Sequence, residues 1–303
     1  MASRDRSVSL HSPTLWPTWA GVWLFRQLCR LPWSAQLRLG RLFGRLIFHA
    51  VRLRRKIVAV NLELCFPEKT CAERRALALA HYESMGVGIF ETGMAWWGAD
   101  EKLPPFSIVG RENLDAASEG GRGVLLLTAH FTTLEMCGRF FVDNIPMGGL
   151  YREPDNRVIA HEMYKHRVAK MKPAIPMDDL RGLLRGLRDG ATIWYAPDQG
   201  KKSKFAAILP FFGVPALTNT ATSKIAQMSG AAVVPYFGFR MEDGSYRLEI
   251  LPELENFPTD DANEDAIRIN RLIEDQIQRA PEQYFWMHRR FKRRGKGLPN
   301  VYR

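Results

Sequence analysis

The chain has 303 residues, of which 46% are hydrophobic and 25% charged, a composition that excludes disordered and fibrous proteins. Its formal net charge of +11 indicates an anionic partner, but this charge is unevenly distributed. Residues 1–60 hold eleven Lys and Arg against one acid (net +10), residues 288–303 hold seven against none (net +7), and the residues between them sum to −6. The chain is therefore a mildly acidic body with two basic ends.

The N-terminal segment, residues 1–60, combines basic side chains with tryptophan, leucine and phenylalanine. Its apolar stretch at 10–25 contains Pro13 and Pro17 and is shorter than the roughly 20 apolar residues of a membrane-spanning helix. Between residues 36 and 56, one side of a predicted helix is basic and the other apolar. The basic positions are Arg38, Arg41, Arg45, His49 and Arg52. This pattern predicts a helix lying in the interface of an anionic membrane, and an ordinary surface helix with a solvated basic side is the alternative. Basic residues interleaved with Trp, Leu and Phe suit a bilayer better than nucleic acid, which we do not expect as a partner.

Residues 61–303 form the expected catalytic domain with a basic C-terminal tail, and predicted strands alternate with predicted helices in this domain. The tail, residues 289–294, is expected to bind an anionic partner or, as the alternative, to be solvated next to the membrane. A capping box at 70–73 begins a helix that runs to about residue 97. Strands are predicted at 124–129, 148–151, 192–196, 231–239 and 246–251, with the last two forming a hairpin. Helices are predicted at 134–142, 157–171, 178–188, 218–228 and 264–279. This alternation predicts an α/β fold with a mixed, largely parallel central sheet flanked by helices.

The residues that most strongly indicate chemistry are His130 and Glu135, which follow the predicted strand at 124–129. Parallel sheets place reactive groups directly after a buried strand. An acid five residues later, at the start of a helix, would orient the imidazole and leave its other nitrogen to take a proton from a hydroxyl. The alternative is structural: residues 132–135 also fit a capping box, and His130 would then be a buried histidine with satisfied hydrogen bonds.

Three further polar clusters also follow predicted elements. Arg152 lies in a loop after the strand at 148–151, Arg167 lies in a basic stretch of the next helix, and Asp198 follows the strand at 192–196. Each cluster alone fits turn chemistry or a solvated surface. Together they would line the strand ends from which His130 emerges, and arginine is suited to binding phosphate because its guanidinium binds bidentately.

Several common enzyme classes are excluded by missing motifs. The four cysteines form no CxxC pair, zinc pattern or disulfide framework, and the chain has no P-loop, GxSxG, GxGxxG or HExxH motif. We therefore expect no metal, and direct attack of a bound hydroxyl on an activated acyl group. A metal-dependent hydrolase using His130 and Asp198, and a non-catalytic binding protein, are the alternatives.

Seven blocks spread over about residues 50–295 resemble the late (secondary) acyltransferases of lipid A biosynthesis, of the lauroyl and myristoyl type, within the lysophospholipid acyltransferase superfamily. The blocks are 54–56 with 61–67, His130 with Glu135, 151–152 with Asn156, 196–198, 210–213, 228–231 with Pro235, and 286–292. The chain lacks the Glu-Gly-Thr-Arg block of the glycerolipid branch and has 197–200 in that region, which argues against a lysophosphatidate acceptor.

This resemblance implies a glycerolipid-acyltransferase-like fold and transfer of a fatty acyl chain from acyl carrier protein to a hydroxyacyl group of a Kdo-bearing, phosphorylated lipid A precursor. It implies that His130 is the general base with Glu135 as its partner, and that Arg167, Asp198 and Arg152 bind substrate. Acyl-acyl carrier protein is the implied co-substrate and no cofactor is expected. The implied location is the inner membrane, with the catalytic domain on its cytoplasmic face. The nearest alternative is transfer to another membrane glycolipid or a lysophospholipid.

Overall fold

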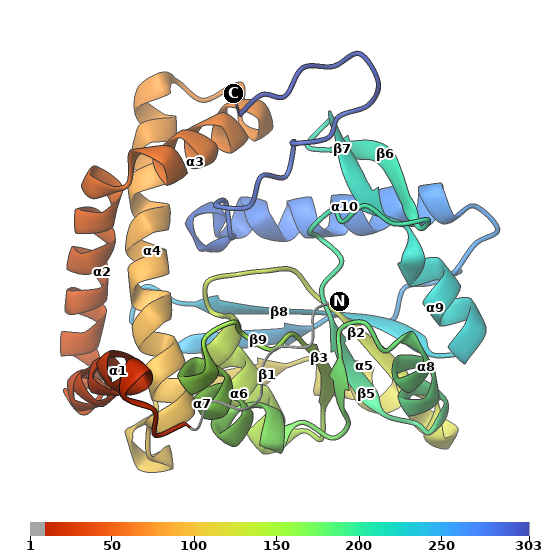
Figure 1. Ribbon diagram of the computed structural model, residues 1–303. Helices are drawn as coiled ribbons and strands as arrows, with labels where there is room; N and C mark the ends of the chain where they lie inside the picture. Colours follow the sequence, from red (N-terminus) through yellow and green to blue (C-terminus); the bar gives the residue numbers. More distant parts are fainter. Residues whose placement is uncertain (1–9, 303) are drawn as a thin grey trace.

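A seven-stranded sheet forms the centre of the molecule, of which the computed structural model describes residues 10–302 (Figure 1). The strands are β1 (Phe106–Val109), β2 (Val124–Leu127), β3 (Gly148–Tyr151), β4 (Ala174–Pro176), β5 (Thr192–Tyr195), β8 (Ala232–Arg240) and β9 (Tyr246–Ile250). Their spatial order is β1-β9-β8-β2-β5-β3-β4, and neighbours run parallel except for the hairpin of β8 and β9. The predicted α/β fold with a mixed, largely parallel sheet is therefore confirmed. The first nine residues of the predicted N-terminal segment lie outside the described part of the chain.

Ten α-helices lie among the described residues, most of them within a few residues of the predicted positions. They are α1 (Trp16–Leu28), α2 (Trp33–Ala50), α3 (Arg52–Cys65), α4 (Cys71–Trp97), α5 (Arg111–Ala117), α6 (Leu134–Asn144), α7 (Arg157–His166), α8 (Leu180–Arg188), α9 (Ala221–Ser229) and α10 (Ala262–Arg279). The predicted capping box is formed at the start of α4, where Thr70 and Glu73 bond reciprocally. The helix predicted from residue 218 begins later, because β7 (Val214–Asn219) pairs with β6 (Ala206–Phe211) in a separate hairpin.

Both faces of the sheet are buried, and β2 shows this most clearly because its four side chains are all inaccessible to solvent. Leu125 and Leu127 belong to a core shared with α3, α8, α9 and α10. Val124 and Leu126 point to the opposite face, where the core is shared with α5 and α6. Successive residues of a strand point to opposite faces, so an uninterrupted apolar run is what a sheet covered on both sides requires.

The N-terminal helices are packed on the body through α2, which lies along α4 (Figure 1). Glycine permits this approach: a Cβ atom on Gly44 would lie 2.0 Å from the carbonyl oxygen of Tyr82. The single helix expected over 36–56 is broken at Val51, which leaves the helical conformation, so Arg52 lies on α3 and does not continue the basic stripe of α2. The expected domain boundary at residue 60 falls inside α3.

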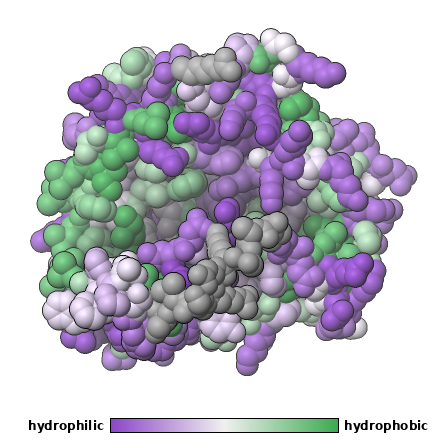
Figure 2. Space-filling model, viewed as in Figure 1, coloured by the Kyte–Doolittle hydropathy of each residue, from purple (hydrophilic) through white to green (hydrophobic). Residues whose placement is uncertain are grey.

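Apolar side chains are exposed on the outer side of the two N-terminal helices. Figure 2 shows hydrophobic residues gathered on the left of the molecule, over α2. The exposed residues are Trp16, Trp23, Leu24 and Leu28 of α1 and Leu39, Leu42, Phe43 and Leu46 of α2, here called the N-terminal apolar surface. Among the described residues, no helix combines the length and apolar character needed to cross a membrane.

Candidate active site

His130 and Asp198 meet at the carboxyl ends of two adjacent parallel strands, β2 and β5. The carboxylate contacts the histidine twice: its Oδ1 lies 2.5 Å from the imidazole Nδ1, and its Oδ2 accepts the backbone N–H of His130 at 3.0 Å. The hydroxyl of Tyr284 donates to the same Oδ2 at 3.2 Å. Because a carboxylate only accepts, Nδ1 carries the proton in this contact. The lone pair of the partly exposed imidazole therefore lies on Nε2, which is bonded to none of the described residues.

The electrostatics of this pair favour a charged, tightly bound histidine. Burial alone would lower the pKa of His130, but the charge of Asp198 and the hydrogen bond to it outweigh burial and raise this pKa above its ordinary value. Burial alone would raise the pKa of Asp198, but the contacts with His130 lower it. The two pKa shifts are opposite in direction and both favour the charged pair, so the buried carboxylate stabilises the imidazolium that forms when His130 takes a proton.

Glu135, the partner predicted for His130, is held elsewhere. Its Oε1 lies 2.9 Å from Nη1 of Arg167, and its Oε2 accepts the indole N–H of Trp96 at 3.0 Å. The predicted orienting contact at Nδ1 is made by Asp198 instead, because α6 directs Glu135 toward α4 and α7 while the loop after β5 runs beside His130. The capping-box alternative is not formed either, since the hydroxyl of Thr132 bonds that of Ser84 and the carboxylate of Glu135 bonds Arg167 and Trp96.

Of the other predicted residues, Arg167 belongs to this site and Arg152 stands apart. Arg167 is close enough for its charge to act on the pKa of His130, which it lowers. Arg152 is exposed in the loop after β3 and is not among the described residues lining the two cavities near His130. The structure thus brings together His130, Asp198, Arg167 and Glu135, and leaves Arg152 outside the cluster.

An apolar cavity begins beside His130, whose ring lies edge-on to Trp194 with centroids 6.2 Å apart. The cavity has about 460 Å³ of space free of protein atoms, counting space open to solvent. Its apolar lining consists of Ala95, Trp96, Leu134, Val142, Met147, Met171 and Trp194, and its polar lining includes Glu135 and Arg167. An apolar pocket with a few charged groups at one end is the usual form of a site for an amphipathic small molecule.

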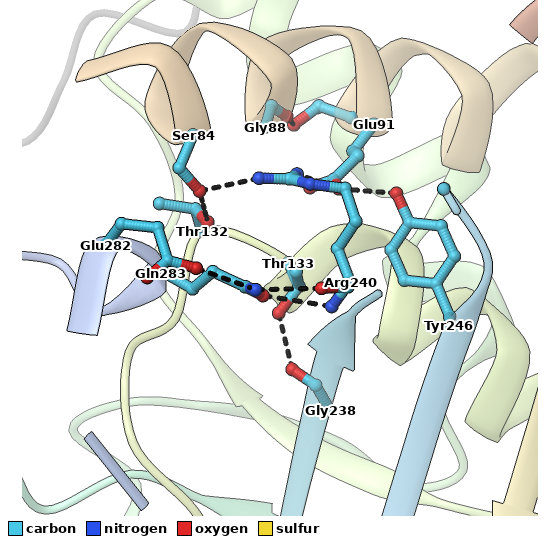
Figure 3. Close-up of polar contacts among 12 residues, drawn as sticks. Ser84, Gly88, Glu91, Thr132, Thr133, Gly238, Arg240, Tyr246, Glu282 and Gln283 are labelled. Carbon is cyan, nitrogen blue, oxygen red and sulfur yellow. Dashed lines mark hydrogen bonds and ion pairs between the residues drawn. The ribbon is translucent and has the colours of Figure 1, made fainter. Parts of the chain in front are cut away.

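A buried polar network lies beneath the loop that carries His130 (Figure 3). Arg240 at the end of β8 pairs with Glu91 of α4 and donates to the hydroxyl of Ser84 at 2.6 Å. Ser84 in turn bonds the hydroxyl of Thr132 at 2.7 Å, two residues after His130. The backbone N–H of Thr132 donates to the carbonyl of Gln283 at 2.7 Å, so the loop is fixed from both sides.

The sequence analysis did not identify three residues near His130. They are Arg240 in the buried network, Tyr284, which bonds Asp198, and His288, which lies close enough for His130 and Asp198 to act on its pKa. Tyr284 reaches Asp198 from the segment just before the basic tail, for which a solvated tail was one of the two expectations. The sequence did indicate that this segment is buried, because the large apolar residues Trp286 and Phe291 stand beside its basic residues. Both are fully buried. Arg240 sits at the end of a predicted strand, and nothing in its neighbourhood distinguishes it from a surface arginine.

The comparisons with known proteins agree with the geometry of the site. The family described as bacterial lipid A biosynthesis acyltransferase matches residues 4–293. The chain is 39% identical to the lipid A biosynthesis lauroyltransferase of Escherichia coli K12, over 98% of each chain. It is 36% identical to the palmitoleoyltransferase of the same organism, over 96% of this chain and 95% of the other, and 24% identical to its myristoyltransferase, over 97% and 93%. The match over residues 4–293 and the 39% identity to a curated member show that the chain belongs to the bacterial lipid A biosynthesis acyltransferase family.

Proposed function

We propose that this protein transfers a fatty acyl chain from acyl carrier protein to a hydroxyacyl group of a Kdo-bearing lipid A precursor. Family membership gives the broader activity, O-acyl transfer in the late acylation of lipid A. The observation that carries the proposal is the His130 imidazole, bonded at Nδ1 by Asp198 and left with an Nε2 that none of the described residues bonds. The adjoining apolar cavity supports a fatty acyl donor, because it offers burial to a methylene chain worth about 0.8 kcal/mol per CH₂ group.

The proposed mechanism needs one base and no covalent enzyme intermediate. Nε2 of His130 takes the proton of the acceptor hydroxyl as its oxygen attacks the thioester carbonyl carbon. The tetrahedral intermediate then expels the thiol sulfur, which receives the proton back from Nε2. One ester bond forms and one thioester bond breaks, so protons and electrons balance. Asp198 stabilises the intermediate imidazolium, and Arg167, held by Glu135, stabilises the developing oxyanion.

Mass spectrometry of the lipid product tests this function. The purified protein would be supplied with fatty acyl-acyl carrier protein and a tetra-acylated Kdo-bearing precursor. We expect one added acyl ester with the unaltered protein and, with His130→Ala, a rate lower by about 10²–10⁴, the contribution of a positioned general base. Near-normal turnover by His130→Ala would rule out the base, and transfer only to a lysophospholipid or another glycolipid would replace the proposed acceptor.

We further propose that the protein works at the cytoplasmic face of the inner membrane, on which α1 and α2 lie. The N-terminal apolar surface supports this, because its exposed leucines and tryptophans are flanked by Arg38 and Arg41 of α2. A helix of this kind buries its apolar side among lipid chains and its cations among anionic headgroups. Each cation near an anionic leaflet contributes about 1 kcal/mol.

Flotation with anionic vesicles tests the membrane proposal. Leu42→Glu with Leu46→Glu places two charges on the N-terminal apolar surface, where the native side chains are 53% and 60% exposed. We expect this variant to lose most vesicle binding while its unfolding transition is unchanged. The matched control is Leu180→Glu on α8, where the leucine is 45% exposed and outside this surface. Equal flotation of the two variants would contradict the proposal.

A further inference from the structure

A second cavity, here called the basic groove, is lined by residues that contact or adjoin the catalytic pair and shares no lining residue with the apolar cavity. It encloses about 1860 Å³, counting space open to solvent. Helix α3, the loop after β5 and the segment after α10 form its walls. Its exposed or half-exposed cations are Arg54, Lys201, Lys202, Arg289, Lys292 and Arg293, and no acidic residue is among the described residues that line it. Figure 2 shows hydrophilic side chains around the hollow in the middle of this face.

No acid neutralises the cations of the basic groove. Within the described part of the chain, none of these six side chains forms an ion pair or hydrogen bond. Several arginines elsewhere are paired with acids, as Arg122 is with Glu253 and Arg279 with Glu249. Like charges gathered around one hollow repel each other, and low-dielectric walls concentrate their field inside it. An anionic ligand removes this repulsion.

The basic groove adjoins the catalytic pair of His130 and Asp198. Phe285, which lines it, donates its backbone N–H to the carbonyl of His130 at 2.9 Å. Gly200 lines the groove two residues after Asp198. His288 lies in the same wall, and both His130 and Asp198 act on its pKa, which burial lowers. A ligand anchored in the groove is therefore held next to His130, by residues other than those that line the apolar cavity.

We propose that the basic groove binds the phosphorylated sugar headgroup of the acceptor lipid, and so places its hydroxyacyl group at His130. This rests on the proposed function and assigns the two substrates to separate cavities near the histidine. Guanidinium groups bind phosphate oxygens bidentately, and lysines add point charges. Leu53, Ile57 and Met287 supply apolar contacts in the same groove for the first methylenes of the acyl chains.

The shape of the groove favours a headgroup over an acidic carrier protein. A stable protein interface needs roughly 800 Å² of complementary surface on each partner, offered as a broad face. Here the cations converge on a concave space, the form typical of a small-molecule site. Arg54 and Leu53 at its edge also continue from the N-terminal helices, so a lipid held by the bilayer has a short path into the groove.

Steady-state kinetics with two forms of acceptor test this assignment. The variants are Lys201→Gln with Lys202→Gln on one wall, and Arg289→Gln with Arg293→Gln on the other. The matched control, Arg181→Gln with Arg185→Gln, removes the same charge from exposed positions on α8 that do not line the groove. We expect KM for the phosphorylated acceptor to rise about tenfold or more in each groove variant, as the loss of charge-assisted hydrogen bonds predicts. KM for the dephosphorylated acceptor and for the acyl donor should stay at the value of the control.

Three outcomes would overturn the assignment. A rise in KM for acyl carrier protein, with KM for the acceptor unchanged, would make the groove the carrier protein's docking site. If the control and the groove variants raised KM for the phosphorylated acceptor equally, the rise would come from the overall charge of the protein and not from the groove. Inorganic phosphate that competes as tightly as the phosphorylated lipid would make the groove a site for free phosphate.

A binding measurement separates this inference from the proposed function. His130→Ala would be floated with zwitterionic vesicles containing the phosphorylated glycolipid or its dephosphorylated form. Preference for the phosphorylated lipid, lost in the groove variants, supports the groove even if the unaltered protein transfers no acyl chain. Acyl transfer without any such preference leaves the function standing and overturns the groove.

Discussion

Replacing Asp198 with asparagine is expected to lower kcat/KM by about two to four orders of magnitude. The carboxylate now holds the proton on Nδ1 and leaves the Nε2 lone pair to act as base. The asparagine amide has nearly the same shape but donates as well as accepts, so it stabilises the tautomer in which Nε2 is protonated. It also removes the negative charge that compensates the imidazolium formed during attack.

The same substitution should move the acidic limb of the pH–rate profile. His130 acts as a base only when neutral, and Asp198 raises its pKa, so we expect the rate to fall as pH drops through a pKa above 6.5. In Asp198→Asn, burial still lowers the pKa of His130 but no carboxylate raises it. The acidic limb should therefore move to lower pH, while the maximum rate falls. The profile of kcat/KM against pH, measured for both proteins, checks this.

Glu135→Gln is the matched control for this prediction. It makes the same change from carboxylate to amide within the site, but Glu135 contacts Arg167 and Trp96 rather than the imidazole. Its acidic limb should therefore stay near that of the unaltered protein, even if the rate falls. A limb displaced by Glu135→Gln and not by Asp198→Asn would mean that Glu135 is the partner of His130 during catalysis.

The sequence predicted Glu135 as the partner of His130, whereas the structure has Asp198 in that position. This difference illustrates which contacts a sequence reveals. Both residues were recognisable as acids beside predicted elements, and Glu135 was chosen because it is five residues from His130. The contact with Asp198 depends on β2 and β5 being neighbours, although β3 and β4 intervene in the chain. Strand order is a non-local property that hydrophobic periodicity does not encode, whereas the positions of the strands themselves were predictable from their apolar runs.

The N-terminal and C-terminal basic regions show the same limit. The spacing of basic residues correctly indicated a helix near residue 40, but the break at Val51 follows from packing of α2 against α4 and of α3 against the body. For the basic residues after His288, anion binding and a solvated tail beside the membrane were the two expectations. Trp286 and Phe291 are buried, Arg290 donates to the carbonyl of Leu217, and Arg289, Lys292 and Arg293 line the basic groove.

Replacing Arg240 with methionine is expected to lower the free energy of unfolding by about 3–5 kcal/mol, the cost of breaking a buried ion pair by removing one partner. Glu91 is fully buried, and of its two oxygens Oε1 faces Arg240 and Tyr246 while Oε2 has no partner (Figure 3). Without the guanidinium, its negative charge would remain in the core with only the Tyr246 hydroxyl to compensate it. Urea unfolding measures the loss.

Two comparisons make this result specific to the buried pair. Arg279→Met breaks a pair with Glu249 in which the arginine is 47% exposed, and solvent screening should limit its cost to about 1 kcal/mol or less. Glu91→Met with Arg240→Met removes both charges and should recover much of the stability lost by Arg240→Met alone, because no unpaired charge is left in the core. If Arg240→Met cost no more than Arg279→Met, the network under the catalytic loop would contribute no more than a surface contact.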